Sequence, residues 1–344
     1  FGSVAEMLAA VEAYDAGTIL QARTYLYEVV STGEHLTTAG GVKLKVLPVA
    51  GYVWAEAWAD TVTEASLVAA KNAVVAMRLA TTTAQPVRAP LTFACASDVT
   101  VQNTFDISNG GYMLLGLNID FKNATIRGVA GGNIDATNPV MRIQCAFSEI
   151  KCPLVDGGRI GSCLDLNNVW YSRVYCSRTQ NFKDLGGVGV VAFGTKLSGQ
   201  ASNSITFAPY SLEVRPDTIS DPTELTGVAF LIDAYDCSLV NPTFGAANRC
   251  FYLTENAAQV MVSNPHPWNN GSYGNPSLGV REDTIVIESH AGGKCYFTEG
   301  YYDNGKILDY GGRLHVTGFF FTLDSQVNFT DAYMVKVICI AATH

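Results

Sequence analysis

The residues best suited to acid–base chemistry are carboxylates that directly follow short apolar segments. Asp233, Glu288 and Asp309 occupy this position. If the segments coil and stack, neighbouring strands lie about 4.8 Å apart, so Glu288 and Asp309 are expected roughly 5 Å apart and Asp233 near 10 Å from Glu288. Carboxylates at such distances can divide the two roles of glycoside cleavage, the closer pair suiting retention and the wider pair inversion.

The same alignment predicts a longer line of polar residues along the stack. Its members are Gln144, Asn167, Asp233, Thr254, Glu288 and Asp309. A solvated polar corner is the alternative interpretation, because Asp, Asn and Thr collect in any outward-facing turn.

Aromatic residues with polar neighbours give a second signal. The expected substrate-binding residues are His266, Trp268, Tyr273, Tyr301, Tyr302 and Glu299. Flat rings stack on the apolar face of a sugar while carboxylates bind its hydroxyls, although the same rings can pack against a neighbouring subunit. No phosphate loop, EF-hand, zinc helix or Ser-His-Asp order is present, so no cofactor or metal is expected.

One short pattern positions these residues. Between 229 and 323 an alternating apolar triplet, a polar corner and a second strand recur about every 20 to 25 residues, with extra length only at certain corners. Stacked supersecondary units have this signature. The pattern predicts a mainly β chain with a right-handed parallel β-helix, or solenoid, over 91–325. A β-sandwich or jelly roll is the alternative, which needs hairpins at closer spacing.

The remaining segments are expected to flank this β-helix. Ser3 and Glu6 have capping-box spacing for a helix ending near Gly17, and strands 18–20, 25–30 and 42–47 complete a small α+β module over 1–55. Thr61 and Glu64 repeat that spacing before a helix at about 62–79. Its expected apolar face contains Ala65, Val68, Val75, Ala76 and Leu79. This helix, in 56–90, is expected to cap the β-helix, and 326–344 to form a C-terminal strand segment.

Composition limits the classes of partner. The net charge of -9 leaves no basic cluster for a phosphate backbone, so nucleic acid is not expected. The low charged fraction, 15%, indicates oligomerisation. The nine cysteines have no zinc-site spacing, and Cys152 and Cys176 occupy equivalent positions, which favours a reduced core ladder and synthesis in a reducing cytosol. No membrane span or leader is expected, and a first residue of Phe indicates a trimmed chain.

The segments 1–7 and 16–19, the capping helix, the Asn/Gly-rich turns and the stretch 264–271 together resemble bacteriophage tailspike or tail-fibre proteins with a pectate-lyase-like β-helix. The resemblance implies a virion protein assembled in the host cytoplasm. It also implies a homotrimer that binds, and often cuts, bacterial surface polysaccharide during host attachment, with its N-terminal side toward other tail proteins. Two departures are the absence of a particle-binding domain before Phe1 and of a trimerisation extension at His344.

Three functions stay open from the sequence. The first is the tailspike, as a depolymerase or as a non-cleaving adhesin. Hydrolysis is favoured over lyase chemistry because neither Lys294 nor Arg313 is grouped with a base. The second is a secreted pectinase-like enzyme, and the third is a structural virion appendage whose aromatic residues lie in subunit interfaces.

Overall fold

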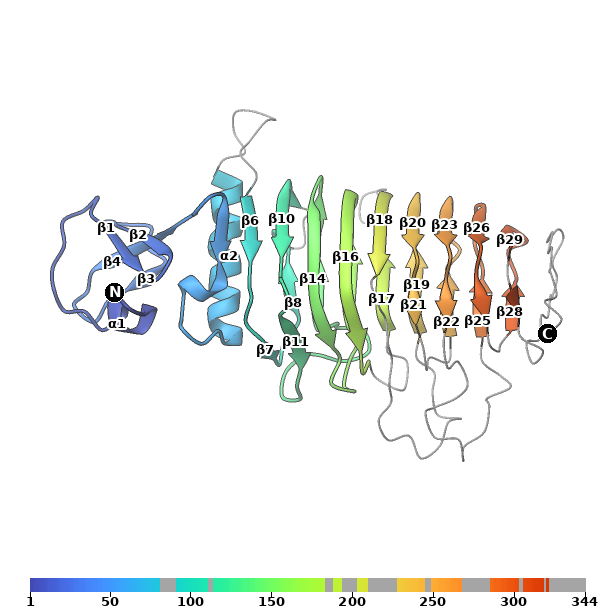
Figure 1. Ribbon diagram of the computed structural model, residues 1–344, viewed down its shortest axis with the longest axis horizontal. Coiled ribbons are helices and arrows are strands. Elements are labelled where there is room, and N and C mark those ends of the chain that lie inside the picture. Colours follow the sequence, from blue (N-terminus) through green and yellow to red (C-terminus); the bar gives the residue numbers. More distant parts are fainter. Residues whose placement is uncertain are drawn as a thin grey trace.

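The computed structural model describes residues 1–80, 91–110, 114–182, 188–193, 203–209, 228–244, 249–267, 285–302, 306–318 and 320–321. Within these residues the protein is mainly β, with parallel sheets, one of them strongly curled. The molecule is elongated, and its strands lie side by side along the long axis (Figure 1). The predicted mainly β class with parallel sheets is therefore confirmed.

A small antiparallel sheet, in the order β1-β2-β4-β3, lies at the N-terminal end (Figure 1). The elements here are α1 Val4–Leu8, β1 Ile19–Ala22, β2 Tyr25–Val29, β3 Leu36–Thr37 and β4 Lys43–Leu47. Ser3 caps α1 as predicted, because the Glu6 N–H donates to Ser3 Oγ at 3.0 Å. The prediction that this helix continues to Gly17 is wrong: Val11 is 74% exposed, so no apolar face continues past Leu8.

A long helix follows, α2 Glu64–Ala80, after the short 3-10 helix η1 Ala55–Ala57. The predicted helix is confirmed to within two residues, but its cap and its buried face are different. Thr63 and Ser66 exchange the capping bonds, while the Glu64 carboxylate accepts from the backbone N–H groups of Gln102 and Asn103. The buried residues are Leu67, Ala70, Ala73, Val74 and Val75, of which only Val75 was on the predicted face.

Two large parallel sheets make up the rest. The 14-stranded sheet contains β5 Tyr52–Trp54, β6 Leu91–Ala94, β7 Val99–Val101, β9 Leu114–Leu115, β10 Leu117–Asp120, β11 Thr125–Gly128, β13 Cys145–Ala146, β14 Glu149–Asp156, β16 Trp170–Gln180, β18 Asn203–Pro209, β20 Cys237–Val240, β23 Val260–Ser263, β26 Cys295–Thr298 and β29 Leu314–Thr317. The 8-stranded sheet contains β8 Phe105–Ile107, β12 Met141–Ile143, β15 Leu164–Asn167, β17 Val188–Phe193, β19 Val228–Asp233, β22 Arg249–Leu253, β25 Ile285–Ser289 and β28 Lys306–Asp309. Short pairs are formed by β21 Thr243–Phe244 with β24 His266–Pro267, and by β27 Tyr301–Tyr302 with β30 Phe320–Phe321.

From β14 onward, apart from the short strands β21, β24, β27 and β30, consecutive strands alternate between the two large sheets, so the chain builds successive layers. The strands β19, β20 and β21 make one layer, and β22, β23 and β24 of the next layer pair with them in parallel, each with its counterpart. The backbone groups of one layer are thereby satisfied by the next. Side chains at equivalent positions on successive layers consequently become neighbours about 4.8 Å apart.

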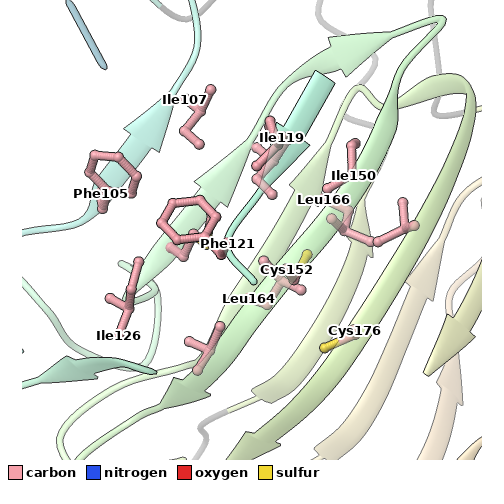
Figure 2. Packing of buried hydrophobic residues seen from close by; sticks show 14 of the residues in the cluster. Phe105, Ile107, Ile119, Phe121, Ile126, Ile150, Cys152, Leu164, Leu166 and Cys176 are labelled. Carbon is pink, nitrogen blue, oxygen red and sulfur yellow. The ribbon is translucent and has the colours of Figure 1, made fainter. Parts of the chain in front are cut away.

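Side chains of both sheets share one apolar interior. Figure 2 shows Phe105, Ile119, Phe121 and Leu164 in this interior, and all four are at most 1% exposed. Cys152 faces Cys176 on the neighbouring strand, and the eight cysteines in the described ranges are all buried and form no disulfide bond. The predicted cysteine ladder is confirmed. Among the helices described, none is long and apolar enough to cross a membrane.

Candidate functional site

The outer face of the 8-stranded sheet carries a charged and aromatic cluster. Tyr252 lies between Phe251 and Leu253, both fully buried, so the alternation of the strand turns the Tyr252 ring outward. Glu288 faces outward from β25 for the same reason. The register places Tyr252 directly opposite Glu288, in strands that lie side by side near the C-terminal end of the described stack (Figure 1).

Both oxygens of the Glu288 carboxylate are in contact with neighbouring side chains. Arg249 Nε lies 2.6 Å from Oε2, and His290 Nε2 lies 3.0 Å from Oε1. The Glu288 side chain is 11% exposed, against 34% for Arg249. Because Arg249 comes from β22 and His290 from the turn after β25, two layers hold the carboxylate in place.

Aromatic rings extend this cluster. The His290 ring stacks on that of Tyr310, with centroids 4.7 Å apart and planes at 13°, and it also packs against Tyr252 at 5.4 Å. Arg249 lies 6.0 Å from the centroid of the Tyr252 ring. We call Arg249, Tyr252, Glu288, His290 and Tyr310 the Glu288 cluster. It combines ring surface with groups that donate to and accept from hydroxyls, which is the composition of a sugar site.

Asp233 ends β19, on the layer before Tyr252. Its Oδ1 accepts from Thr254 Oγ1 and, at 2.9 Å, from Asn256 Nδ2, both in the next layer. Asp233 and Thr254 therefore do lie in one line, as predicted. Asp233 is 6% exposed, and its side chain points toward the layer that contains Tyr252.

The prediction that Glu288 and Asp309 share a line is wrong. Glu288 lies opposite Leu308, and Asp309 lies opposite Ser289, with a register irregularity between Ile285 and Ile287. Since neighbouring residues of a strand point to opposite faces, Asp309 does not join Glu288 on the outer face. The expected pair about 5 Å apart, and the retaining chemistry that it suggested, are thus not supported.

Asp309 instead organises its own turn. It is fully buried, and its carboxylate accepts from the backbone N–H groups of Gly311 at 3.2 Å, Gly312 at 3.1 Å and Leu314 at 3.2 Å. Asp309 and Ser289 occupy the interior position that Leu253 fills one layer earlier. The geometry assigns Asp309 a structural task in the corner between β28 and β29.

Four of the predicted substrate-binding residues lie in or beside strands that do not belong to the 8-stranded sheet, which carries the Glu288 cluster. His266 is in β24, and Tyr301 and Tyr302 are in β27, so these three belong to the short strands, which contact one another. Glu299 is exposed in the corner before β27, with a φ of 57°. Trp268 and Tyr273 lie outside the described residues.

Four members of the Glu288 cluster were not predicted: Arg249, Tyr252, His290 and Tyr310. For Tyr252, His290 and Tyr310 the signal in the sequence is that each alternates with a buried neighbour, whereas Arg249 has the parity of Phe251 and gives no such signal. Within the described part of the chain, no three His, Cys, Asp or Glu side chains are placed to hold a metal ion. No protein-family model and no curated protein matches this chain.

Proposed function

We propose that the stacked layers form a right-handed parallel β-helix, and that the protein is a bacteriophage tailspike or tail-fibre protein that binds bacterial surface polysaccharide during host attachment. Stacked parallel layers on both sides of one core support the architecture. The Glu288 cluster carries the functional proposal, because it joins an anchored carboxylate, an arginine and three rings on one outer face.

In this proposal the rings and the charged groups have separate tasks. The exposed Tyr310 ring stacks on the apolar face of a pyranose, Arg249 donates to sugar hydroxyls, and Glu288 accepts from them. The protein acts as a homotrimer in the virion, with its N-terminal module toward other tail proteins. Three equivalent sites multiply individually weak contacts with a repetitive glycan.

If the protein cleaves the polysaccharide, Glu288 and Asp233 are the two catalytic carboxylates. These residues are two layers and two strand positions apart, roughly 12 Å between Cα atoms at about 4.8 Å per layer and 3.3 Å per residue. Asp233 contacts Thr254 and Glu288 contacts Arg249, so both carboxylates contact the layer that lies between them. A wide pair of this kind leaves room for a water molecule and suits an inverting glycoside hydrolase.

The roles follow from the contacts of each oxygen. Oε2 of Glu288 lies 2.6 Å from Arg249 Nε, and in this proposal Glu288 is the base that activates water. Both donors to Asp233 contact Oδ1, which leaves Oδ2 to hold the proton that the leaving group receives. The low exposure of Asp233, 6%, and of Glu288, 8%, favours the second candidate, an adhesin that binds the glycan without cutting it.

Incubation with purified bacterial surface polysaccharides separates these functions. Size-exclusion chromatography follows chain length, and a glycan array follows binding. The hydrolase predicts that Glu288→Gln stops shortening, whereas Glu255→Gln, which removes the same charge from an exposed corner, does not. Unchanged chain length on a glycan that the wild type binds supports the adhesin. Absence of binding to every polysaccharide refutes both.

A further inference from the structure

Two aromatic side chains form an exposed column beside the 14-stranded sheet, away from the Glu288 cluster. Phe147 is 62% exposed and Tyr171 is 54% exposed, yet their rings stack with centroids 5.2 Å apart and planes at 8°. Backbone bonds from Gly116 N to Ala146 O and from Phe147 N to Trp170 O show that Gly116, Phe147 and Tyr171 occupy the same corner on three successive layers.

The backbone at this corner has an unusual conformation. The φ angles are 62° at Gly116, 55° at Phe147 and 44° at Tyr171, all in the left-handed region. Glycine adopts this conformation freely, whereas a side chain with a Cβ is strained there. Burial of the rings would offset the strain, but more than half of each side chain is exposed. The fold itself therefore gives no reason for two bulky aromatic residues at a glycine position.

The column is closed on one side. Arg78 Nε donates to the carbonyl of Leu115 at 2.6 Å, and a Cβ on Gly116 would lie only 2.6 Å from Arg78 Nη2. On the other side, β18 pairs with β16 through Trp170 with Asn203 and Ser172 with Ile205. Among the described residues, Phe147 is the ring that stacks on Tyr171.

We propose that this column is a second glycan-binding site, in which the ring of Tyr171 stacks on a pyranose of the same polysaccharide. This inference rests on the proposed function. Two rings and Leu115 offer far less surface than the roughly 800 Å² that each partner buries in a stable protein interface, but one ring face matches one sugar ring. Glu149 and Arg173 lie opposite each other on the adjoining strands, both exposed, and can bind its hydroxyls.

Replacing both aromatic residues by glycine tests the proposal. In the double variant Phe147→Gly/Tyr171→Gly, apparent affinity on an array of bacterial surface polysaccharides is expected to fall about tenfold or more. The melting temperature is expected to equal or exceed that of the wild type, because glycine relieves the positive φ. Tyr175→Ala is the matched control: it removes an exposed tyrosine four residues along β16, outside the corner, and is expected to retain binding.

The possible results of this experiment distinguish failure of the second site from failure of the proposed function. A melting temperature below that of Tyr175→Ala would show that the rings stabilise the fold, and would overturn the proposal whatever happens to binding. Unchanged glycan affinity in the double variant would overturn this site and leave the proposed function standing. A wild type that binds no polysaccharide would overturn both.

Discussion

Replacing Asp309 is expected to destabilise the fold, although the sequence had indicated Asp309 as one of the catalytic carboxylates. The Asp309 carboxylate is fully buried and accepts three backbone N–H groups of the turn that joins β28 to β29. Asp309→Ala removes all three acceptors at once. The turn between β28 and β29 then loses the acceptor for three of its backbone N–H groups.

The size of the effect follows from the surroundings of each donor. Gly311 is exposed and Gly312 is half-buried, so water replaces the carboxylate there, at a cost of about 0.5–1.5 kcal/mol for each bond. Leu314 is fully buried, so its N–H remains unpaired at a cost of about 1–3 kcal/mol. Removing the Asp309 carboxylate also removes the cost of burying it, which offsets part of this loss. We expect Asp309→Ala to lower the free energy of unfolding by roughly 3 kcal/mol.

Urea denaturation of the wild type, Asp309→Ala and Asp309→Asn measures this difference. The asparagine keeps one carbonyl oxygen but turns an N–H₂ group toward a backbone donor, so an intermediate loss is expected. Glu288→Gln is the comparison, because its carboxylate contacts side chains instead of a turn. An Asp309→Ala protein as stable as the wild type would refute the structural assignment.

Two further predictions concern buried titratable groups. Burial raises the pKa of Asp165 despite the nearby Arg142, so ionisation costs stability as pH rises through that pKa. At pH 7 urea denaturation should therefore show Arg142→Gln losing about 3 kcal/mol or more, and Asp165→Asn losing less. Burial, with Lys45 nearby, lowers the pKa of His35, whose Nδ1 accepts from the Val46 N–H at 3.0 Å. Because the unfolded chain then takes the proton first, stability is retained above about pH 6.5 and lost below it, and melting curves of His35→Phe should lack this dependence.

The alternation of apolar residues was sufficient to find the strands. The triplets that begin at Phe230, Phe251, Ile285 and Ile307 all lie in strands of the 8-stranded sheet, and each is followed by a strand of the 14-stranded sheet. Such triplets are recognisable because one side of each strand must enter the shared core. Parallel pairing followed from their spacing along the chain, which is too long for hairpins.

The same alternation does not determine register. A pattern with period two matches itself after a shift of two residues, so Ile285 and Ile287 were equally good partners for Phe251. The structure pairs Phe251 with Ile287. The deciding feature is that Ser289 faces the interior at 0% exposure, and a buried serine has no signal in a hydrophobic pattern. This shift of two residues displaced Glu288 from the line of Asp233 and Thr254, and a difference of one residue in the next pairing, which places Asp309 opposite Ser289, separated Glu288 from Asp309.

Whether a carboxylate is structural or functional depends on partners that the sequence does not reveal. Asp309 bonds backbone N–H groups within five residues of itself, so its contacts define the turn and leave nothing for a ligand. Asp233 and Glu288 contact side chains that belong to a neighbouring layer, where a sugar hydroxyl can replace or join them. All three residues follow an apolar segment and were therefore equivalent as candidates. Their separation into one residue that bonds its own turn and two residues that contact a neighbouring layer arises only from stacking, because stacking decides which atoms of the next layer each side chain meets.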